Sequence, residues 1–282
     1  MIEVFYECSD GTKINFTSDV ISVDNPEALV GNAWEYSSIA GSGGLSRIKR
    51  FFKDAQETEL TLEILADNAE QYNEVMEQMH RCFERDIRTM EPGRLWWGDF
   101  YKECYIVESK YDEFEELLEY VEKKITIVSV SPFWTKISTH HFYAREEQAG
   151  TLDYPFDYGS GSGGYDFDAP GQAEYFRNES IYDANFALIF YGPASNPQAV
   201  IGGHSYTLYT TLTAGERAEI NSRTKKITKY TVNGTEENVF HTRDKENYIF
   251  KKIPNGYLSV NKADALALDI VIYDERGEPT WI

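Results

Sequence analysis

The sequence lacks the cysteine patterns and short motifs that mark many metal and catalytic sites. Its 282 residues include three widely spaced cysteines, Cys8, Cys82 and Cys104, which form no C-x-x-C pair. This odd number excludes a complete disulfide framework and a zinc finger, and predicts reduced, mostly buried thiols. No G-x-S-x-G, P-loop or dinucleotide-binding motif occurs. We expect no cofactor and no catalytic residue, but a site built from scattered residues stays open, because such sites are recognised in three dimensions.

Positive charge and long apolar runs are also scarce. Lysine and arginine total 27 against 47 aspartates and glutamates, which gives a formal net charge of −20. Clustered cations bind nucleic-acid backbones and anionic membrane surfaces, so we expect neither partner. No apolar run reaches membrane-spanning length, which predicts no membrane insertion. The opening residues, MIEVFYECSDGTKINF, are acidic and alternating, which is unlike a signal peptide and favours folding in the cytoplasm.

Alternating apolar residues indicate a mainly β chain. Aromatic residues make up 15% of it, including 20 tyrosines and 16 phenylalanines, which suit strands and broad interfaces. In the first half we expect strands near Ile2–Tyr6, Leu60–Ile64 and Val121–Val130. Together with one helix, these strands predict an N-terminal domain over residues 1–138.

The one prominent helix is predicted over residues 68–89. Its apolar residues recur at spacings of three and four, as on one face of a helix: Ala69, Tyr72, Met76, Met79, Phe83 and Ile87. Asn68 with Gln71 resembles a capping box, and Pro92-Gly93 stops the helix. The two methionines are therefore expected in the core, and not in a cofactor site.

A basic segment stands out in this acidic chain. The loop Gly41–Gly44 has no Gly-Lys-Ser/Thr ending, so it predicts a hairpin turn and not a phosphate-binding loop. Leu45–Phe52 follows with three cations, Arg47, Lys49 and Arg50. These cations form either a solvated strand face or a contact strip for an acidic neighbouring subunit, since charge complementarity often fixes the register between subunits.

Residues 139–170 are predicted to connect two domains. They contain the tract GSGSGG, which has no periodicity. Four aspartates leave a calcium site open, although the alternate ligands and closing glutamate of an EF-hand are missing: Asp153, Asp157, Asp166 and Asp168. The adjacent His140 and His141 would point to opposite faces of a strand, which argues against a metal pair.

The C-terminal domain, residues 171–282, is predicted to be a β-sandwich of antiparallel sheets. Asn233-Gly234 is a strong hairpin signal, because both residues tolerate positive φ. We expect a further strand at Tyr248–Phe250 and a turn at Pro254–Gly256. Several tyrosines belong either to the sandwich core and its interfaces or to a glycan-facing platform: Tyr206, Tyr209, Tyr230 and Tyr257.

Short motifs follow one another in a fixed order through the last seventy or so residues. They are Gly215-Glu216 with Ile220, Asn233-Gly234, Asn238-x-Phe240, Ile253-Pro254-x-Gly256 and Arg276-x-x-x-Pro279-x-Trp281. This order resembles the C-terminal part of the distal tail proteins of long-tailed, non-contractile bacteriophages. The layout of the first half, with its glycine-broken loop, helix and long strand into Pro132-Phe133-Trp134, is similar to the N-terminal domain of that family.

The resemblance implies a structural subunit of a phage or prophage tail tip. In that family the N-terminal domain forms a ring, usually a homo-hexamer, and the C-terminal sandwich is galectin-like or carbohydrate-module-like. The implied partners are the tail tube protein, a tail-associated hub or lysin protein, and receptor-binding or other baseplate proteins. The implied location is the virion tail tip, after synthesis in the bacterial host cytoplasm.

Two other functions stay open. A carbohydrate-binding module would adhere to host surface glycans through exposed tyrosines. A glycoside hydrolase would use paired carboxylates, for which the acidic run over residues 111–120 is the candidate. A contiguous acidic run is typical of a solvated face, so the structural subunit is the preferred interpretation.

Overall fold

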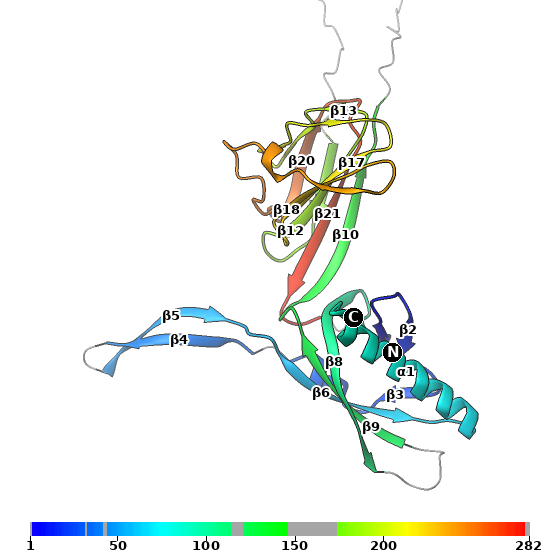
Figure 1. The fold of residues 1–282 in the computed structure, drawn as a ribbon. Helices are drawn as coiled ribbons and strands as arrows, with labels where there is room; N and C mark the ends of the chain where they lie inside the picture. Colours follow the sequence, from blue (N-terminus) through cyan, green and yellow to red (C-terminus); the bar gives the residue numbers. More distant parts are fainter. Residues whose placement is uncertain (1, 32, 42–43, 114–120, 146–173, 280–282) are drawn as a thin grey trace, which may run out of the picture. The chain divides into compact units, whose positions relative to one another are not determined.

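The chain divides into two compact units. This computed structural model describes residues 2–31, 33–41, 44–113, 121–145 and 174–279 (Figure 1). Unit 1 comprises residues 1–136 and 275–282, and unit 2 comprises residues 137–274. Strands β10 (Trp134–Phe142) and β21 (Leu268–Arg276) contribute residues to both units. Each unit has its own cluster of buried apolar side chains.

Unit 1 is built on an antiparallel sheet with the strand order β2-β1-β7-β8-β9-β6-β3. On β6, the residues Leu60, Leu62 and Ile64 are buried and alternate with half-buried ones, because successive strand residues point to opposite faces. A short 3-10 helix spans Pro26–Leu29. The strands are β1 (Val4–Glu7), β2 (Lys13–Asn15), β3 (Ile21–Val23), β6 (Glu57–Ile64), β7 (Gly93–Trp97), β8 (Phe100–Glu113) and β9 (Val121–Ser129).

Helix α1 (Ala69–Thr89) packs on this sheet and completes the core of unit 1. Asn68 caps its first turn, since the Asn68 side chain accepts a hydrogen bond from the Gln71 amide at 2.9 Å. The Gln71 side chain reaches back to the Asp67 amide at 2.8 Å, which is one residue earlier than in a capping box. Met90, at φ 58°, ends the helix in the left-handed conformation.

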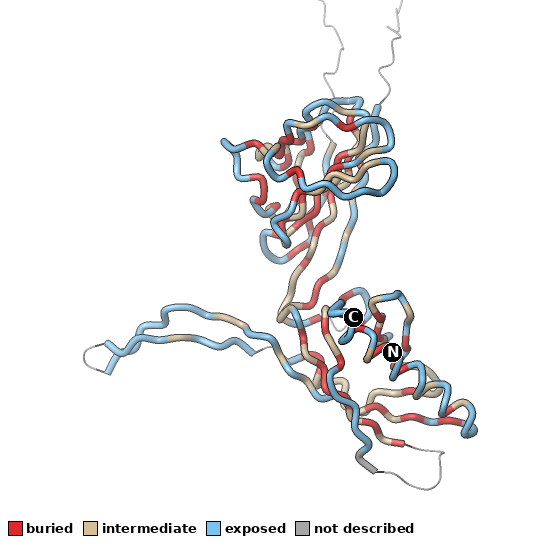
Figure 2. The backbone as a smooth tube through the Cα atoms, in the orientation of Figure 1, coloured by how far each residue is buried: buried red, intermediate tan, exposed pale blue. Residues whose placement is uncertain are grey.

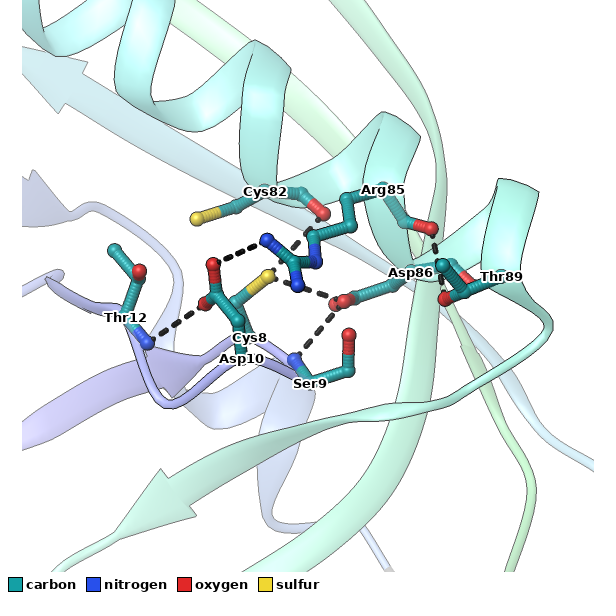
Figure 3. A network of polar contacts seen from close by, with 8 residues as sticks. All are labelled: Cys8, Ser9, Asp10, Thr12, Cys82, Arg85, Asp86 and Thr89. Atoms are coloured by element: carbon teal, nitrogen blue, oxygen red, sulfur yellow. Dashed lines mark hydrogen bonds and ion pairs between the residues drawn. The ribbon is translucent and has the colours of Figure 1, made fainter.

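A buried carboxylate joins the helix to the β1–β2 hairpin (Figure 3). Asp86 is fully buried and accepts hydrogen bonds from the Tyr6 hydroxyl at 2.5 Å and the Ser9 amide at 2.9 Å. The Cys8 thiol donates to the same carboxylate at 3.1 Å. Burial is the main cause that raises the pKa of both Tyr6 and Cys8, and the bonds to Asp86 raise them further. Both groups therefore stay protonated as donors, which satisfies the carboxylate inside the core.

Unit 2 is a β-sandwich. One sheet has the order β19-β18-β17-β12-β21-β10, and the other has the order β11-β20-β14-β15. Phe186 and Phe190 of β12 belong to the same buried cluster as Ile201, Tyr206 and Val260 of the second sheet. The strands are β11 (Glu174–Asn178), β12 (Asn185–Tyr191), β13 (Ala194–Ser195), β14 (Gln198–Ile201), β15 (His204–Thr207), β16 (Thr211–Leu212), β17 (Arg217–Asn221), β18 (Lys226–Tyr230), β19 (Glu236–Asn238) and β20 (Gly256–Lys262); a 3-10 helix spans Phe240–Thr242.

The predicted fold class is confirmed, because the described residues form antiparallel sheets with α1 as their one α-helix. The galectin-like character of the C-terminal sandwich stays a prediction. The strand expected at Tyr248–Phe250 is wrong: Ile249 and Phe250 form a turn, and the rings of Tyr248 and Phe250 pack against each other with their centroids 6.1 Å apart. Residues 139–142 of the predicted connection belong to β10, and its aspartates and the GSGSGG tract lie outside the described residues.

Candidate interaction surface

An exposed two-stranded arm extends from unit 1. It consists of β4 (Glu35–Ala40) and β5 (Ser46–Phe52), which pair with each other and with no other strand of the described residues. Figure 2 shows both strands almost entirely exposed, and Figure 1 shows the arm pointing away from α1 and the sheet of unit 1. An isolated two-stranded hairpin is at best marginally stable in water. The pairing of β4 with β5 is therefore not enough to stabilise the arm by itself.

The strand register divides the arm into two different faces. Tyr36 pairs with Phe51, and Ser38 pairs with Ile48, so Tyr36, Ile48 and Phe51 share one face. Their side chains are 62%, 49% and 60% exposed. The opposite face carries Arg47 and Arg50, which pair with Ile39 and Ser37. We call the first of these the apolar face of the arm. Exposed apolar side chains gathered on one face mark an interaction site.

The predicted contact strip Arg47, Lys49 and Arg50 lies on this arm, and all three residues are exposed. All three belong to β5, so the cations line one edge of the arm. The register shifts between Ser37 and Ser38, which leaves Lys49 without a cross-strand partner, as in a β-bulge. Their contact with another subunit stays a prediction.

The arm is anchored at its root by an aromatic and cationic cluster. The Lys53 ammonium lies 5.6 Å from the ring centroid of Trp34 and 5.7 Å from that of Phe133. The two rings are 5.9 Å apart. Burial lowers the pKa of Lys53, and its ammonium has no hydrogen-bond partner among the described residues. The root is therefore fixed by side-chain packing and cation–π attraction.

The glycan-facing tyrosines predicted in unit 2 are not gathered on one face. The glycan-facing alternative would place Tyr206 at the surface, but this residue is only 1% exposed. Its hydroxyl donates a hydrogen bond to the Lys251 carbonyl at 2.7 Å. It is a core residue, because its position on β15 points into the sandwich. Tyr257 is exposed on the smaller sheet, whereas Tyr230 lies half-buried on the larger one under the Arg217 guanidinium. Tyr209 is exposed in the loop after β15.

The remaining chemical candidates give no site in the part of the chain that the structure describes. No group of three or more His, Cys, Asp or Glu residues that could hold a metal is found in the described ranges. Cys8, Cys82 and Cys104 are free and buried, and burial raises the pKa of Cys104 to about 12. The calcium candidates Asp153, Asp157, Asp166 and Asp168 lie outside the described residues. No described helix is long and apolar enough to span a membrane.

The fold is similar to that of solved phage proteins along nearly the whole chain. Neither a protein-family model nor a curated protein matches the sequence. Among solved structures, the chain is similar to SPP1 Dit (gp 19.1), described as a paradigm of the hub adsorption apparatus in phages infecting Gram-positive bacteria. That likeness has a TM-score of 0.60 and 10% identity, and covers 98% of this chain and 99% of the other.

A second similarity is to a chain of the phage P2 baseplate in its activated conformation with Ca. It has a TM-score of 0.62 and 14% identity, and covers 99% of this chain and all of the other. The Sr form of the same baseplate gives a TM-score of 0.62 and 13% identity. The resemblance seen in the sequence motifs thus agrees with a likeness of fold along nearly the whole chain.

Proposed function

We propose that this chain is a structural subunit of a phage or prophage tail tip, acting as a distal tail protein. The observation that carries the proposal is a fold shared with SPP1 Dit and with a P2 baseplate chain over at least 98% of this chain. Such coverage includes both units, so it does not rest on one common β-sandwich. The role is mechanical and not catalytic, and it places the protein in the virion tail tip.

In this role unit 1 forms a ring, expected to be a homo-hexamer, through repeated head-to-tail contacts. Its neighbours in the tail are the tail tube protein and a tail-associated hub or lysin protein. Unit 2 attaches receptor-binding or other baseplate proteins. Support for self-association comes from the arm, because an unsupported hairpin with an apolar face and a basic edge is suited to a neighbouring subunit of an acidic protein.

The test is the state of association in solution, measured by light scattering and by electron microscopy of the main peak. The proposal predicts rings with a central hole, either with the purified chain or after addition of tail tube protein. Reversing the arm cations (Arg47→Glu, Lys49→Glu and Arg50→Glu together) should prevent the ring while leaving the circular dichroism spectrum unchanged.

A matched control separates a local contact from a general charge effect. Three exposed lysines of unit 2 are reversed in the same way: Lys245→Glu, Lys251→Glu and Lys252→Glu. Each set of three reversals changes the net charge by −6, from −20 to −26. Rings should survive in this control. A wild-type chain that stays monomeric at high concentration and with tail tube protein would contradict the proposed function.

A further inference from the structure

A second unpartnered apolar feature of unit 1 is a groove between α1 and β8. It has a volume of about 370 Å³, and its apolar lining is Met76, Met79, Phe83, Ile87, Ile106 and Val107. Met79 and Phe83 belong to the core, but Ile87 is 40% exposed and Val107 is 49% exposed. We call this feature the α1–β8 groove.

The exposure of Val107 has a local cause. The pairing of β8 with β9 shifts between Ile106 and Glu108, so Val107 has no cross-strand partner. A β-bulge of this kind re-aims a side chain that regular pairing would alternate. Here it places an apolar residue in the lining of the groove beside Ile87 of the helix.

Both walls of the groove also carry an exposed carboxylate. Glu84 on the helix pairs with Arg88 at 2.7 Å and with His80 at 3.6 Å, and Glu108 on the strand pairs with Lys110 at 2.7 Å. The side chains of Glu84 and Glu108 are 45% and 44% exposed. Exposed ion pairs contribute little free energy, so either carboxylate is able to exchange its own cation for one on an incoming surface.

We infer that the α1–β8 groove of one copy receives the apolar face of the arm of a second copy. Tyr36, Ile48 and Phe51 would cover Ile87 and Val107, which are the exposed apolar residues of the lining. The inference rests on the proposed ring and names the surface that receives the arm. Because the arm points away from α1 of its own chain (Figure 1), the contact joins different copies and repeats head to tail.

The length of the arm fits this groove. The lining of the groove from Met76 to Ile87 covers about 16 Å at the rise of a helix. The seven residues of β5 cover about 20 Å at the rise of a strand. Arg47 and Arg50 lie on the opposite face of the arm and stay outside the groove, whose lining includes Glu84, Glu108 and Lys123.

Cross-linking tests the contact directly. The double variant Ile48→Cys with Val107→Cys should give a ladder of covalent oligomers under mild oxidation, because each arm cysteine would meet the groove cysteine of the next copy. Either single variant alone should give none, and an equal mixture of the two singles should stop at covalent dimers. The native cysteines are buried and do not interfere. The control pair is Ile48→Cys with Met90→Cys, since Met90 is 76% exposed but outside the groove lining.

Charge introduced into the groove gives an independent readout. Val107→Arg changes an exposed residue, so folding should be retained while the ring is lost; Met90→Arg should leave the ring intact. If the Val107→Arg variant still forms rings, or if rings of the double-cysteine variant give no Ile48–Val107 cross-link, the contact between arm and groove is wrong. The proposed function would still stand. A wild type that never forms a ring would overturn both.

Discussion

Replacing the buried carboxylate of Asp86 should destabilise unit 1 strongly. Asp86→Ala removes the acceptor of the Tyr6 hydroxyl and of the Ser9 amide, which lie 2.5 Å and 2.9 Å from the carboxylate, whereas the Cys8 thiol keeps a second acceptor, the Cys82 carbonyl at 3.6 Å. A buried donor left unsatisfied costs about 1–3 kcal/mol, so the two donors together cost about 2–6 kcal/mol. The variant no longer buries a charged group, and the free energy saved in this way offsets part of the cost of the unsatisfied donors. We expect a net loss of about 3 kcal/mol, a large share of the ~5–15 kcal/mol that stabilises a typical domain.

Urea unfolding followed by tryptophan fluorescence is the appropriate assay. All five tryptophans of the chain belong to the residues of unit 1, and residues 137–274 contain none. The signal therefore reports the unit in which Asp86 lies. Arg85→Ala is the matched control one residue away, because Arg85 pairs with Asp10 at the surface at 2.7 Å. Its effect should be under about 1 kcal/mol.

A double-mutant cycle then assigns the loss to the hydrogen bond. Tyr6→Phe alone removes a donor to a charged acceptor and should cost about 1.5–3 kcal/mol. The double variant of Tyr6→Phe with Asp86→Ala should cost less than the sum of the two, because no orphaned hydroxyl remains. Additive effects, or an Asp86→Ala loss no larger than that of Arg85→Ala, would refute the reasoning.

Three further predictions concern packing and ionisation. Gly93→Ala should lower the free energy of unfolding of unit 1 by about 1–3 kcal/mol in urea titrations, because a Cβ there would lie 2.2 Å from the Tyr6 hydroxyl. Burial, followed by the nearby charge of another lysine, lowers the pKa of Lys102 to about 8, so between pH 8 and 10.5 the unfolded chain binds more protons and stability rises with pH. The difference in free energy of unfolding between Lys102→Met and the wild type, measured in urea titrations, should therefore fall by roughly 3 kcal/mol from pH 8 to pH 10.5. A difference that does not change with pH would contradict the burial of the ammonium. In unit 2, Tyr206→Ala should cost about 3–5 kcal/mol in calorimetry whereas Tyr257→Ala costs little, since only Tyr206 is buried.

Local patterns predicted much of the fold because the signals lie within short stretches. The helix follows from a stripe of apolar residues and a capping Asn68, and the α-helix begins at Ala69. The turn at Asn233-Gly234 follows from two residues that tolerate positive φ, and Gly234 adopts φ 79° between β18 and β19. The arm follows from a glycine-rich segment between two stretches that pair with each other. Glu35 pairs with Phe52 at one end, and Ala40 pairs with Ser46 at the other.

The features that sequence patterns missed depend on residues far apart in the chain. Asp86 lies among arginines on the helix and looks like a surface residue, yet its hydroxyl partner Tyr6 is 80 positions earlier. The segment Tyr248–Phe250 has strand-forming residues, but no neighbouring strand pairs with it and its rings pack on one another. The α1–β8 groove arises from a shift of pairing at Val107, and alternation of residue types carries no signal for such a shift.

The exposed strands of the arm also affect how readily free chains associate with one another. Each of its strands leaves one row of backbone donors and acceptors unpaired, which invites uncontrolled edge-to-edge stacking between chains. Charged residues and bulges are the devices that suppress such stacking, and β5 has both in Arg47, Lys49 and Arg50 and in the shift beside them. The basic residues of β5 are therefore suited to limit such stacking, and neutralising them should increase aggregation of the isolated chain.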